Sequence, residues 1–221
     1  MNGKDITHGK GIELTRTEKR ITISSGGVDI RHEDKPTSGE VMGTGFVYLL
    51  VDCSGSMADS NKLAQAKKGA INFAKEALSK EYFIGLIQFE SSATHICEPQ
   101  REIAILEGHL KKIGAGGGTN MAEAIKIADQ KLKDRKGSRV IVVITDGMPD
   151  SREATLAAAQ EAKKNGIDII TIGTDDADEA FLKKLASRTE LGVKVSREQF
   201  EKGIASTAKM LPQLGPGKKG K

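Results

Sequence analysis

Aromatic residues and cysteines are scarce in this sequence of 221 residues, which has no tryptophan, two tyrosines and two cysteines. Without aromatic side chains interleaved with basic ones, the chain lacks the stacking platforms by which proteins bind single-stranded nucleic acid. Two cysteines, Cys53 and Cys97, are too few for a disulfide framework, and free thiols are typical of a reducing compartment.

A long apolar segment is also missing. No run approaches the roughly 18 apolar residues that cross a bilayer, and the opening MNGKDITHGK has no apolar signal-peptide region. Charge is nearly balanced, with 34 Lys and Arg against 30 Asp and Glu and a net charge of +4. The basic residues near both ends are expected to be solvated. We therefore expect a cytoplasmic monomer that binds neither nucleic acid nor membrane.

Three regions of the chain differ in pattern. Residues 1–43 form an N-terminal extension, expected to be disordered over most of 1–19 and to contain a β-hairpin at 20–31, where apolar residues alternate around a Gly-Gly pair. Residues 44–211 carry regular strand and helix patterns and are expected to be one domain, which suits the chain's size. Residues 212–221 are expected to be a flexible basic tail.

Strand and helix patterns alternate through 44–211. Such alternation favours right-handed crossovers and a mainly parallel sheet in a doubly wound α/β fold, with helices on both faces. In this class the functional crevice lies beyond the carboxyl ends of the strands. The expected strands are 46–52, 81–89, 92–98, 140–147, 168–174 and 192–196, and the expected helices are 60–79, 101–113, 119–133, 151–165, 177–187 and about 197–211.

Oxygen-bearing side chains follow two of the most apolar strands. Asp52, Ser54 and Ser56 alternate directly after FVYLLV, and Asp146 ends VIVVIT. Thr119 follows the glycine run GAGGG and begins a helix at the same edge of the predicted sheet. Two carboxylates and three hydroxyls, without histidine or thiolate, are the ligands of a hard cation. The residues therefore predict a Mg²⁺ site, with Mn²⁺ or Ca²⁺ as alternatives.

Simpler interpretations exist for some of these residues. Asp52 could merely end its strand, and either Thr119 or Asn120 could cap the following helix, since Glu123 lies at capping-box spacing. Asp150 and Glu153 are typical of the start of the 151–165 helix, so we interpret Asp150 as its cap. The glycine run has no Lys-Ser/Thr and follows a helix, which argues against a nucleotide-binding loop.

Three short motifs resemble the metal-ion-dependent adhesion site of von Willebrand factor A (VWA) domains. They are Asp52-Cys53-Ser54-Gly55-Ser56, Gly117-Gly118-Thr119 and Thr145-Asp146-Gly147. All five ligand positions of that site hold the family's residue types, and the resemblance covers about 44–211. It implies a six-stranded sheet of order 3-2-1-4-5-6, with strand 3 antiparallel at the edge. The architecture is most similar to stand-alone bacterial cytosolic members.

The resemblance also implies a mode of binding. Ser54 and Ser56 would hold the metal directly, while Thr119 and the two aspartates alternate between direct and water-bridged contact. An Asp or Glu of a partner protein would complete the shell. We expect the rim around the metal to include Glu90, Ser91, Asp150 and Asp175.

These expectations favour a binding module that is not an enzyme and acts in a cytosolic multiprotein assembly. One alternative is the VWA subunit of an AAA+ chelatase-like machine. Another is a Mg²⁺-dependent phosphohydrolase of the haloacid-dehalogenase type. That chemistry needs a second aspartate where this chain has Ser54.

Overall fold

The computed structural model describes residues 23–24, 27–28 and 43–214. The chain divides into two units, Met1–Gly39 and Glu40–Lys221. In the first unit, β1 (Ile23–Ser24) and β2 (Gly27–Val28) pair antiparallel, with Ile23 opposite Val28. The disorder expected within 1–19, the rest of the expected hairpin and the tail beyond 214 lie outside the described residues.

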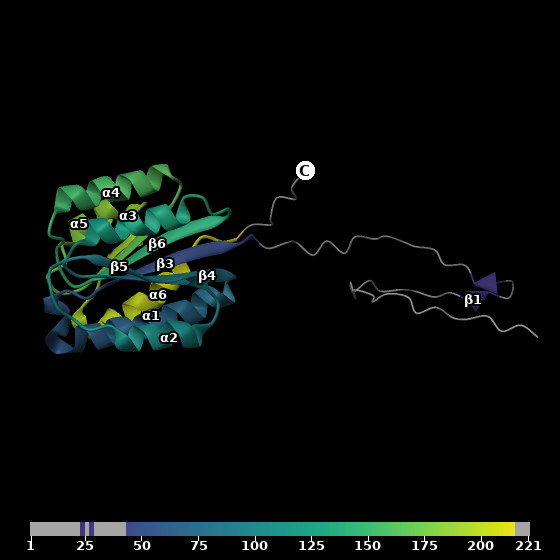
Figure 1. The fold of residues 1–221 in the computed structure, drawn as a ribbon, viewed down its shortest axis with the longest axis horizontal. Coiled ribbons are helices and arrows are strands. Elements are labelled where there is room, and N and C mark those ends of the chain that lie inside the picture. The colour runs from purple at the N-terminus through teal and green to yellow at the C-terminus, as the bar shows by residue number, and fades with distance from the viewer. Residues whose placement is uncertain (1–22, 25–26, 29–42, 215–221) are drawn as a thin grey trace, which may run out of the picture. The chain divides into compact units, whose positions relative to one another are not determined.

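The second unit is built on a six-stranded sheet of order β5-β4-β3-β6-β7-β8. Every neighbouring pair is parallel except β4 and β5, so β5 is an antiparallel edge strand (Figure 1). The predicted strand order and the antiparallel edge are therefore confirmed. The strands are β3 (Gly45–Asp52), β4 (Tyr82–Phe89), β5 (Ala93–Gln100), β6 (Ser138–Thr145), β7 (Asp168–Gly173) and β8 (Gly192–Lys194).

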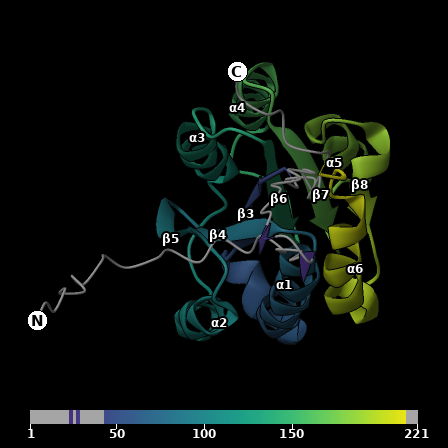
Figure 2. The same ribbon diagram turned by 90° about the vertical axis from the view of Figure 1, so that its right-hand side faces the viewer.

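Helices cover both faces of this sheet, as expected (Figure 2). One face packs against α1, α2 and α6, and the other against α3, α4 and α5. No helix of the described residues is both long and apolar enough to cross a membrane. The helices are α1 (Lys62–Ser79), α2 (Ile103–Lys112), α3 (Met121–Leu132), α4 (Arg152–Lys164), α5 (Glu179–Leu185) and α6 (Phe200–Thr207).

The central strands are apolar because both of their faces are buried. In β3, Val47, Leu49 and Val51 contribute to the core beneath α1, while Tyr48 and Leu50 contribute to the core beneath α3. Residues 140–144 of β6 are equally inaccessible to solvent. The carboxyl ends of these two neighbouring strands are therefore fixed by packing on both sides.

Two of the predicted helices are partly replaced by 3-10 segments. The predicted helix over 60–79 is preceded by a 3-10 segment, Gly55–Asn61, and α1 begins only at Lys62. Ser60 and Asn61 have left-handed backbone conformations (φ 51° and 63°), which prevent the helix from extending towards the site. The predicted helix over 197–211 is a short α-helix, α6, between two 3-10 segments, Arg197–Gln199 and Ala208–Met210.

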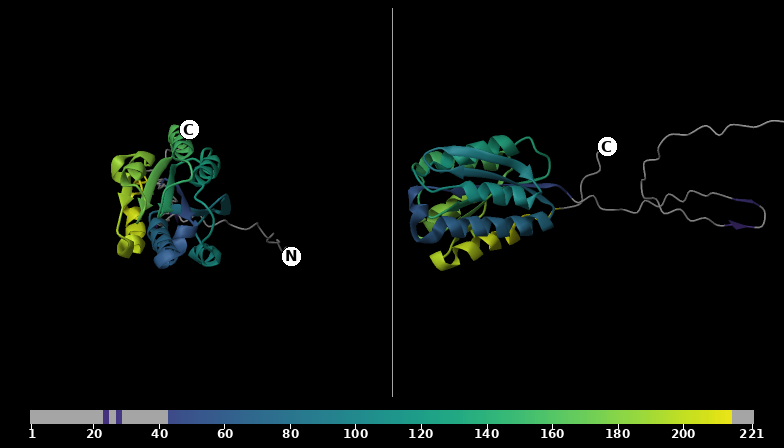
Figure 3. Two further views of the ribbon diagram at one scale, coloured as in Figure 1. Left: turned by 90° about the vertical axis from the view of Figure 1, so that its left-hand side faces the viewer. Right: turned by 60° about the horizontal axis from the view of Figure 1, so that its bottom comes forward.

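Helices α1 and α6 lie side by side on one face and come close together at Gly69 (Figure 3). A Cβ atom at Gly69 would come 2.8 Å from Ile204 Cβ and 2.9 Å from the carbonyl oxygen of Glu201. The close approach therefore requires glycine, although glycine weakens a helix interior.

We predict that Gly69→Ala lowers the free energy of unfolding by about 1–3 kcal/mol, because the new methyl group pushes against the α6 backbone. Gly108→Ala in α2 is the matched control, since a Cβ there would meet nothing within 4 Å. That substitution should stabilise the protein by about 0.5–1 kcal/mol through helix propensity alone. Urea denaturation of both variants measures the difference, and equal stabilisation of the two would contradict the packing argument.

Candidate metal centre

Three loops from distant parts of the chain meet at the carboxyl edge of the sheet. Gly55 N donates to Gly117 O at 3.1 Å, and Gly116 N donates to Cys53 O at 2.8 Å. These bonds join the loop after β3 to the glycine run before α3. Gly117 has a φ of +74°, a conformation that glycine adopts without strain. The glycine run that precedes Thr119 is therefore bent and held against the loop after β3.

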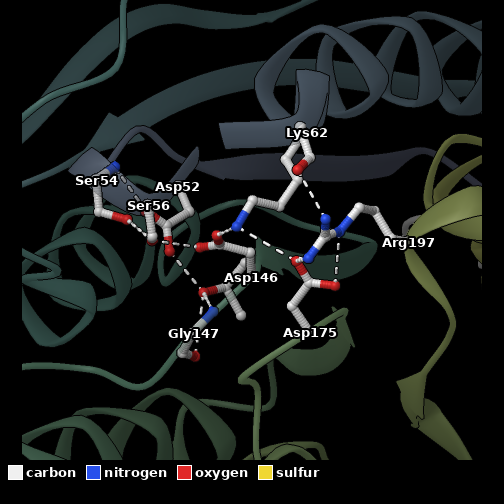
Figure 4. A network of polar contacts seen from close by, with 10 residues as sticks. Asp52, Ser54, Ser56, Lys62, Asp146, Gly147, Asp175 and Arg197 are labelled. Carbon is white, nitrogen blue, oxygen red and sulfur yellow. Dashed lines mark hydrogen bonds and ion pairs between the residues drawn. The ribbon is translucent and has the colours of Figure 1, made fainter. Parts of the chain in front are cut away.

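The side chains that follow β3 and β6 form a continuous polar chain (Figure 4). Asp52 Oδ1 accepts from Ser54 N at 2.8 Å, and Asp52 Oδ2 accepts from Thr145 Oγ1 at 2.5 Å. The hydroxyls of Ser54 and Ser56 lie 3.2 Å apart, and Ser56 Oγ donates to Asp146 Oδ1 at 2.9 Å. These contacts link four of the five predicted ligands to one another: Asp52, Ser54, Ser56 and Asp146.

Both carboxylates are buried. Asp52 is 0% exposed and Asp146 is 1% exposed. Burial, with a smaller contribution from the charge of Asp146, raises the pKa of Asp52 to about 6, despite the hydrogen bonds from Ser54 and Thr145 that lower it. Cys53 is also buried, which raises the pKa of its thiol to about 12, so it behaves as a packing residue.

A buried lysine that the sequence analysis did not single out completes this chain of contacts. Lys62 Nζ lies 2.5 Å from Asp146 Oδ2 and 3.3 Å from Asp175 Oδ2 (Figure 4). Burial alone would lower the pKa of Lys62, but the contacts with Asp146 and Asp175 together outweigh it and the pKa is raised. The sequence offered one indication of this role. Lys62 lies in the first turn of a predicted helix, where the helix dipole disfavours a cation.

Asp175, predicted as a rim residue, faces this lysine and is held by Arg197. Arg197 Nε donates to both carboxylate oxygens of Asp175, at 2.9 and 3.1 Å, and its Nη1 donates to Ser60 Oγ at 2.7 Å. The hydrogen bonds from Arg197, with a smaller contribution from Lys62, lower the pKa of Asp175. Asp175 is therefore an ionised, fixed carboxylate beside the site.

Thr119 is positioned through its main chain. Its N–H donates to Asp150 Oδ1 at 2.9 Å, and its carbonyl oxygen accepts from Asp150 N at 3.0 Å. The cap of α3 is Asn120, whose side chain accepts from Glu123 N at 3.3 Å. Of the two residues considered as caps, Asn120 performs this role, and the Thr119 side chain is not needed for it.

The remaining rim residues surround the glycine run. Ser91 Oγ accepts from Gly118 N at 2.8 Å. A Cβ atom on Gly117 would lie 2.1 Å from Glu90 Oε2, so this carboxylate lies directly against the loop.

The interpretation of Asp150 as a helix cap is wrong. The cap of α4 is Ser151, whose Oγ accepts from Ala154 N at 3.2 Å. Asp150 is free for the Thr119 contact because Ser151 takes the capping position.

The donor set suits a hard cation. Among the described residues, no group of three or more His, Cys, Asp or Glu side chains could hold a metal ion, so thiolate and imidazole sites are not represented. The oxygen atoms of Ser54, Ser56, Asp52 and Asp146 do gather at one place. Asp146 Oδ2 is buried, and among the described residues it is compensated by the Lys62 ammonium at 2.5 Å. Asp52, Ser54 and Ser56 offer only oxygen atoms, the ligands that a hard cation prefers.

Comparison with known proteins places this geometry in a family. The family model of the von Willebrand factor type A domain matches residues 47–205, which include all five predicted ligands. The magnesium-chelatase 67 kDa subunit of Heliobacterium mobile is 27% identical over 162 residues, covering 64% of this chain and 24% of the relative. The thrombospondin-related anonymous protein of Plasmodium falciparum is 26% identical over 141 residues, covering 58% and 25%. The match thus spans about a quarter of the length of each of these two curated relatives.

A solved structure agrees with the fold. The von Willebrand factor domain of the type V pili tip protein Mfa5 from Porphyromonas gingivalis superposes with a TM-score of 0.69 at 14% identity, covering 77% of this chain and 95% of that chain. At this identity the likeness concerns the fold alone. Together with the family match over 47–205, it shows that the chain belongs to the von Willebrand factor type A domain family, a family of protein-interaction modules.

Proposed function

We propose that this protein is a metal-dependent protein-binding module. Mg²⁺ would be held by Asp52, Ser54, Ser56, Thr119 and Asp146, and a carboxylate of a partner protein would complete its shell. The observation that carries the proposal is the gathering of the Ser54 and Ser56 hydroxyls with the buried carboxylates of Asp52 and Asp146 at the carboxyl ends of β3 and β6. Mn²⁺ or Ca²⁺ would suit the same oxygens.

The described side chains explain why a cation would be favoured. A buried carboxylate is costly to ionise, and the pKa of Asp52, raised mainly by burial and less by the nearby charge of Asp146, reflects that cost. A divalent ion at this position would lower it. Since Ser54 and Ser56 contribute neutral oxygens, the ion would keep enough positive charge to attract one further carboxylate.

The rim indicates what kind of partner surface would fit. Ser56, Ser91 and Asp150 are exposed to solvent, so the site is open on this side. Glu90 and Asp150 carry negative charge there, whereas Asp175 is neutralised by Arg197. These rim carboxylates would repel an acidic surface away from the metal. We therefore propose a partner with one Asp or Glu inside a neutral or basic patch.

We propose no catalytic role for the site. Its polar groups are already engaged with one another, and Ser54 stands where a haloacid-dehalogenase-type hydrolase needs an aspartate.

An assembly with an AAA+ ATPase is the second candidate, favoured by the similarity to a magnesium-chelatase subunit. We propose that the protein acts as a cytoplasmic monomer before it joins its assembly. Both of its cysteines are free, as in a reducing compartment.

We predict that millimolar Mg²⁺ or Mn²⁺ raises the melting temperature of the wild-type protein. The stabilisation follows mass action and reaches about 2.7 kcal/mol at a metal concentration 100 times Kd. Asp52→Asn should remove this effect, because a carboxylate at the site is lost. The exposed Asp134→Asn is the control for loss of one negative charge. Thermal melts with metal or EDTA measure the shift, and an equal shift in Asp52→Asn would show that the ion binds elsewhere.

A pH dependence follows from the raised pKa of Asp52, about 6 instead of its usual 3.8. The folded state holds this proton more tightly than the unfolded state. The contribution of Asp52 to stability is therefore complete below about pH 4 and is lost as the pH rises through about 6, a change of about 3 kcal/mol.

In EDTA, the unfolding free energy of wild type should accordingly fall between pH 4 and 6 relative to Asp52→Asn, which stays neutral. Urea titrations at several pH values measure the difference between the two proteins. Parallel curves would mean that Asp52 ionises normally in the folded protein.

We predict that Thr119→Ala weakens partner binding more than it weakens Mg²⁺ binding. In the family, the direct threonine contact to the metal belongs to the arrangement with the partner bound, as the resemblance implies. Thr119→Ser keeps the hydroxyl and should retain both affinities. The partner can be isolated by elution with EDTA, and calorimetry then measures the two affinities separately. If Thr119→Ala leaves partner affinity unchanged, or EDTA leaves the complex intact, the partner docks elsewhere.

A further inference from the structure

Lys62 contacts a proposed metal ligand directly, yet the proposed metal binding does not use it. It is 4% exposed, although it is the first residue of α1. Its ammonium lies 2.5 Å from Asp146 Oδ2, an oxygen of a proposed metal ligand. A lysine buried to this extent normally requires a charged partner, and here that partner is a carboxylate needed for the cation.

A second carboxylate is within reach of the same ammonium. Lys62 Nζ lies 3.3 Å from Asp175 Oδ2. Arg197 fixes Asp175 by hydrogen bonds to both of its oxygens, and Arg197 Nη2 also lies 2.8 Å from Oδ2. Lys62 therefore lies between one carboxylate that belongs to the metal site and one that does not.

The charges of this cluster are balanced without a metal. Lys62 and Arg197 supply two positive charges, and Asp146 and Asp175 supply two negative charges. Adding a divalent cation beside Asp146 would leave the ammonium next to a like charge. The flexible stem of lysine lets its head group turn towards Asp175 with little movement of the backbone.

We propose that Lys62 is a built-in competitor of the metal ion for Asp146, and that its ammonium transfers to Asp175 when a divalent cation binds. This inference rests on the proposed function, because it concerns the same cation site. The lysine keeps Asp146 neutralised in the metal-free protein and weakens metal binding. The apparent Kd equals the intrinsic Kd divided by the fraction of molecules in which the ammonium has left Asp146.

Competition by Lys62 would also link the metal to the partner. A site whose apparent affinity is reduced in this way fills poorly at low Mg²⁺ concentrations. A partner carboxylate that binds only the metal-loaded form stabilises that form alone. The metal and the partner therefore increase each other's affinity. Lys62 thereby makes retention of the ion conditional on the partner.

The first test is calorimetric titration of Mg²⁺ into wild type, Lys62→Met and Lys68→Met. Methionine keeps the length of the lysine stem and removes the charge. Lys68 is an exposed lysine on the same helix, so its variant controls for the loss of one positive charge. We expect Lys62→Met to bind Mg²⁺ at least tenfold more tightly than wild type and Lys68→Met to bind as wild type does. In EDTA, Lys62→Met should melt at a lower temperature, because Asp146 is then buried without a counterion.

The second test uses the wild-type protein and does not depend on the variant folding. With ¹⁵N-labelled lysine, the Lys62 ammonium resonance should move on addition of Mg²⁺, while the resonance of Lys68 stays in place. A third test is a double-mutant cycle between Asp175→Asn and Lys62→Met. Asp175→Asn should weaken Mg²⁺ binding by a larger factor when Lys62 is present than in the Lys62→Met background, because only a lysine at position 62 supplies an ammonium that Asp175 can receive.

The outcomes separate the two proposals. Equal, measurable Mg²⁺ affinity in wild type and Lys62→Met, with no movement of the Lys62 resonance, overturns the competition and leaves the metal site intact. No Mg²⁺ binding by either protein overturns both proposals. Binding by Lys62→Met alone supports the competition and contradicts metal binding by the wild-type protein without its partner.

Discussion

The burial of two carboxylates at the ends of neighbouring strands is the constraint on which the site depends. Asp52 ends β3, Asp146 follows β6, and the two strands are paired from Gly45 and Ser138 to Val51 and Ile144. A carboxylate taken out of water must recover its lost solvation from fixed donors or from a counter-charge. Ser54 N, the hydroxyls of Thr145 and Ser56, and the Lys62 ammonium provide that compensation.

The position of these carboxylates follows from the core rather than from the loops. β3 and β6 are buried on both faces, and a shift of either strand by one residue would move all of its side chains to the opposite face. Packing therefore fixes where Asp52 and Asp146 emerge. The loops then only have to turn back on one another, which the bonds between Gly55 and Gly117 and between Gly116 and Cys53 achieve.

Much of the fold could be predicted because its signals are local. The apolar strands, the helical periodicity and the motifs containing Ser54, Thr119 and Asp146 all lie within short windows of sequence, and the strand order followed from the family resemblance. Lys62 could not be predicted, since its burial depends on Asp146 and Asp175, which lie far along the chain. The cap of α4 was misassigned to Asp150 because Asp150 and Ser151 are both good caps, and only the tertiary contact with Thr119 decides between them.

The parallel strand β3 has a mechanical consequence. The proposed metal loops lie at its carboxyl end, whereas Gly43 precedes its amino end, at the opposite edge of the sheet. Pro212, near the end of the described chain, is also at that opposite edge, since its carbonyl oxygen accepts from Tyr82 at the start of β4. A pulling force between the proposed partner at the site and Gly43 or Pro212 would therefore run lengthwise through the sheet. The ladder hydrogen bonds that join β3 to β4 and β6 would bear this load together in shear.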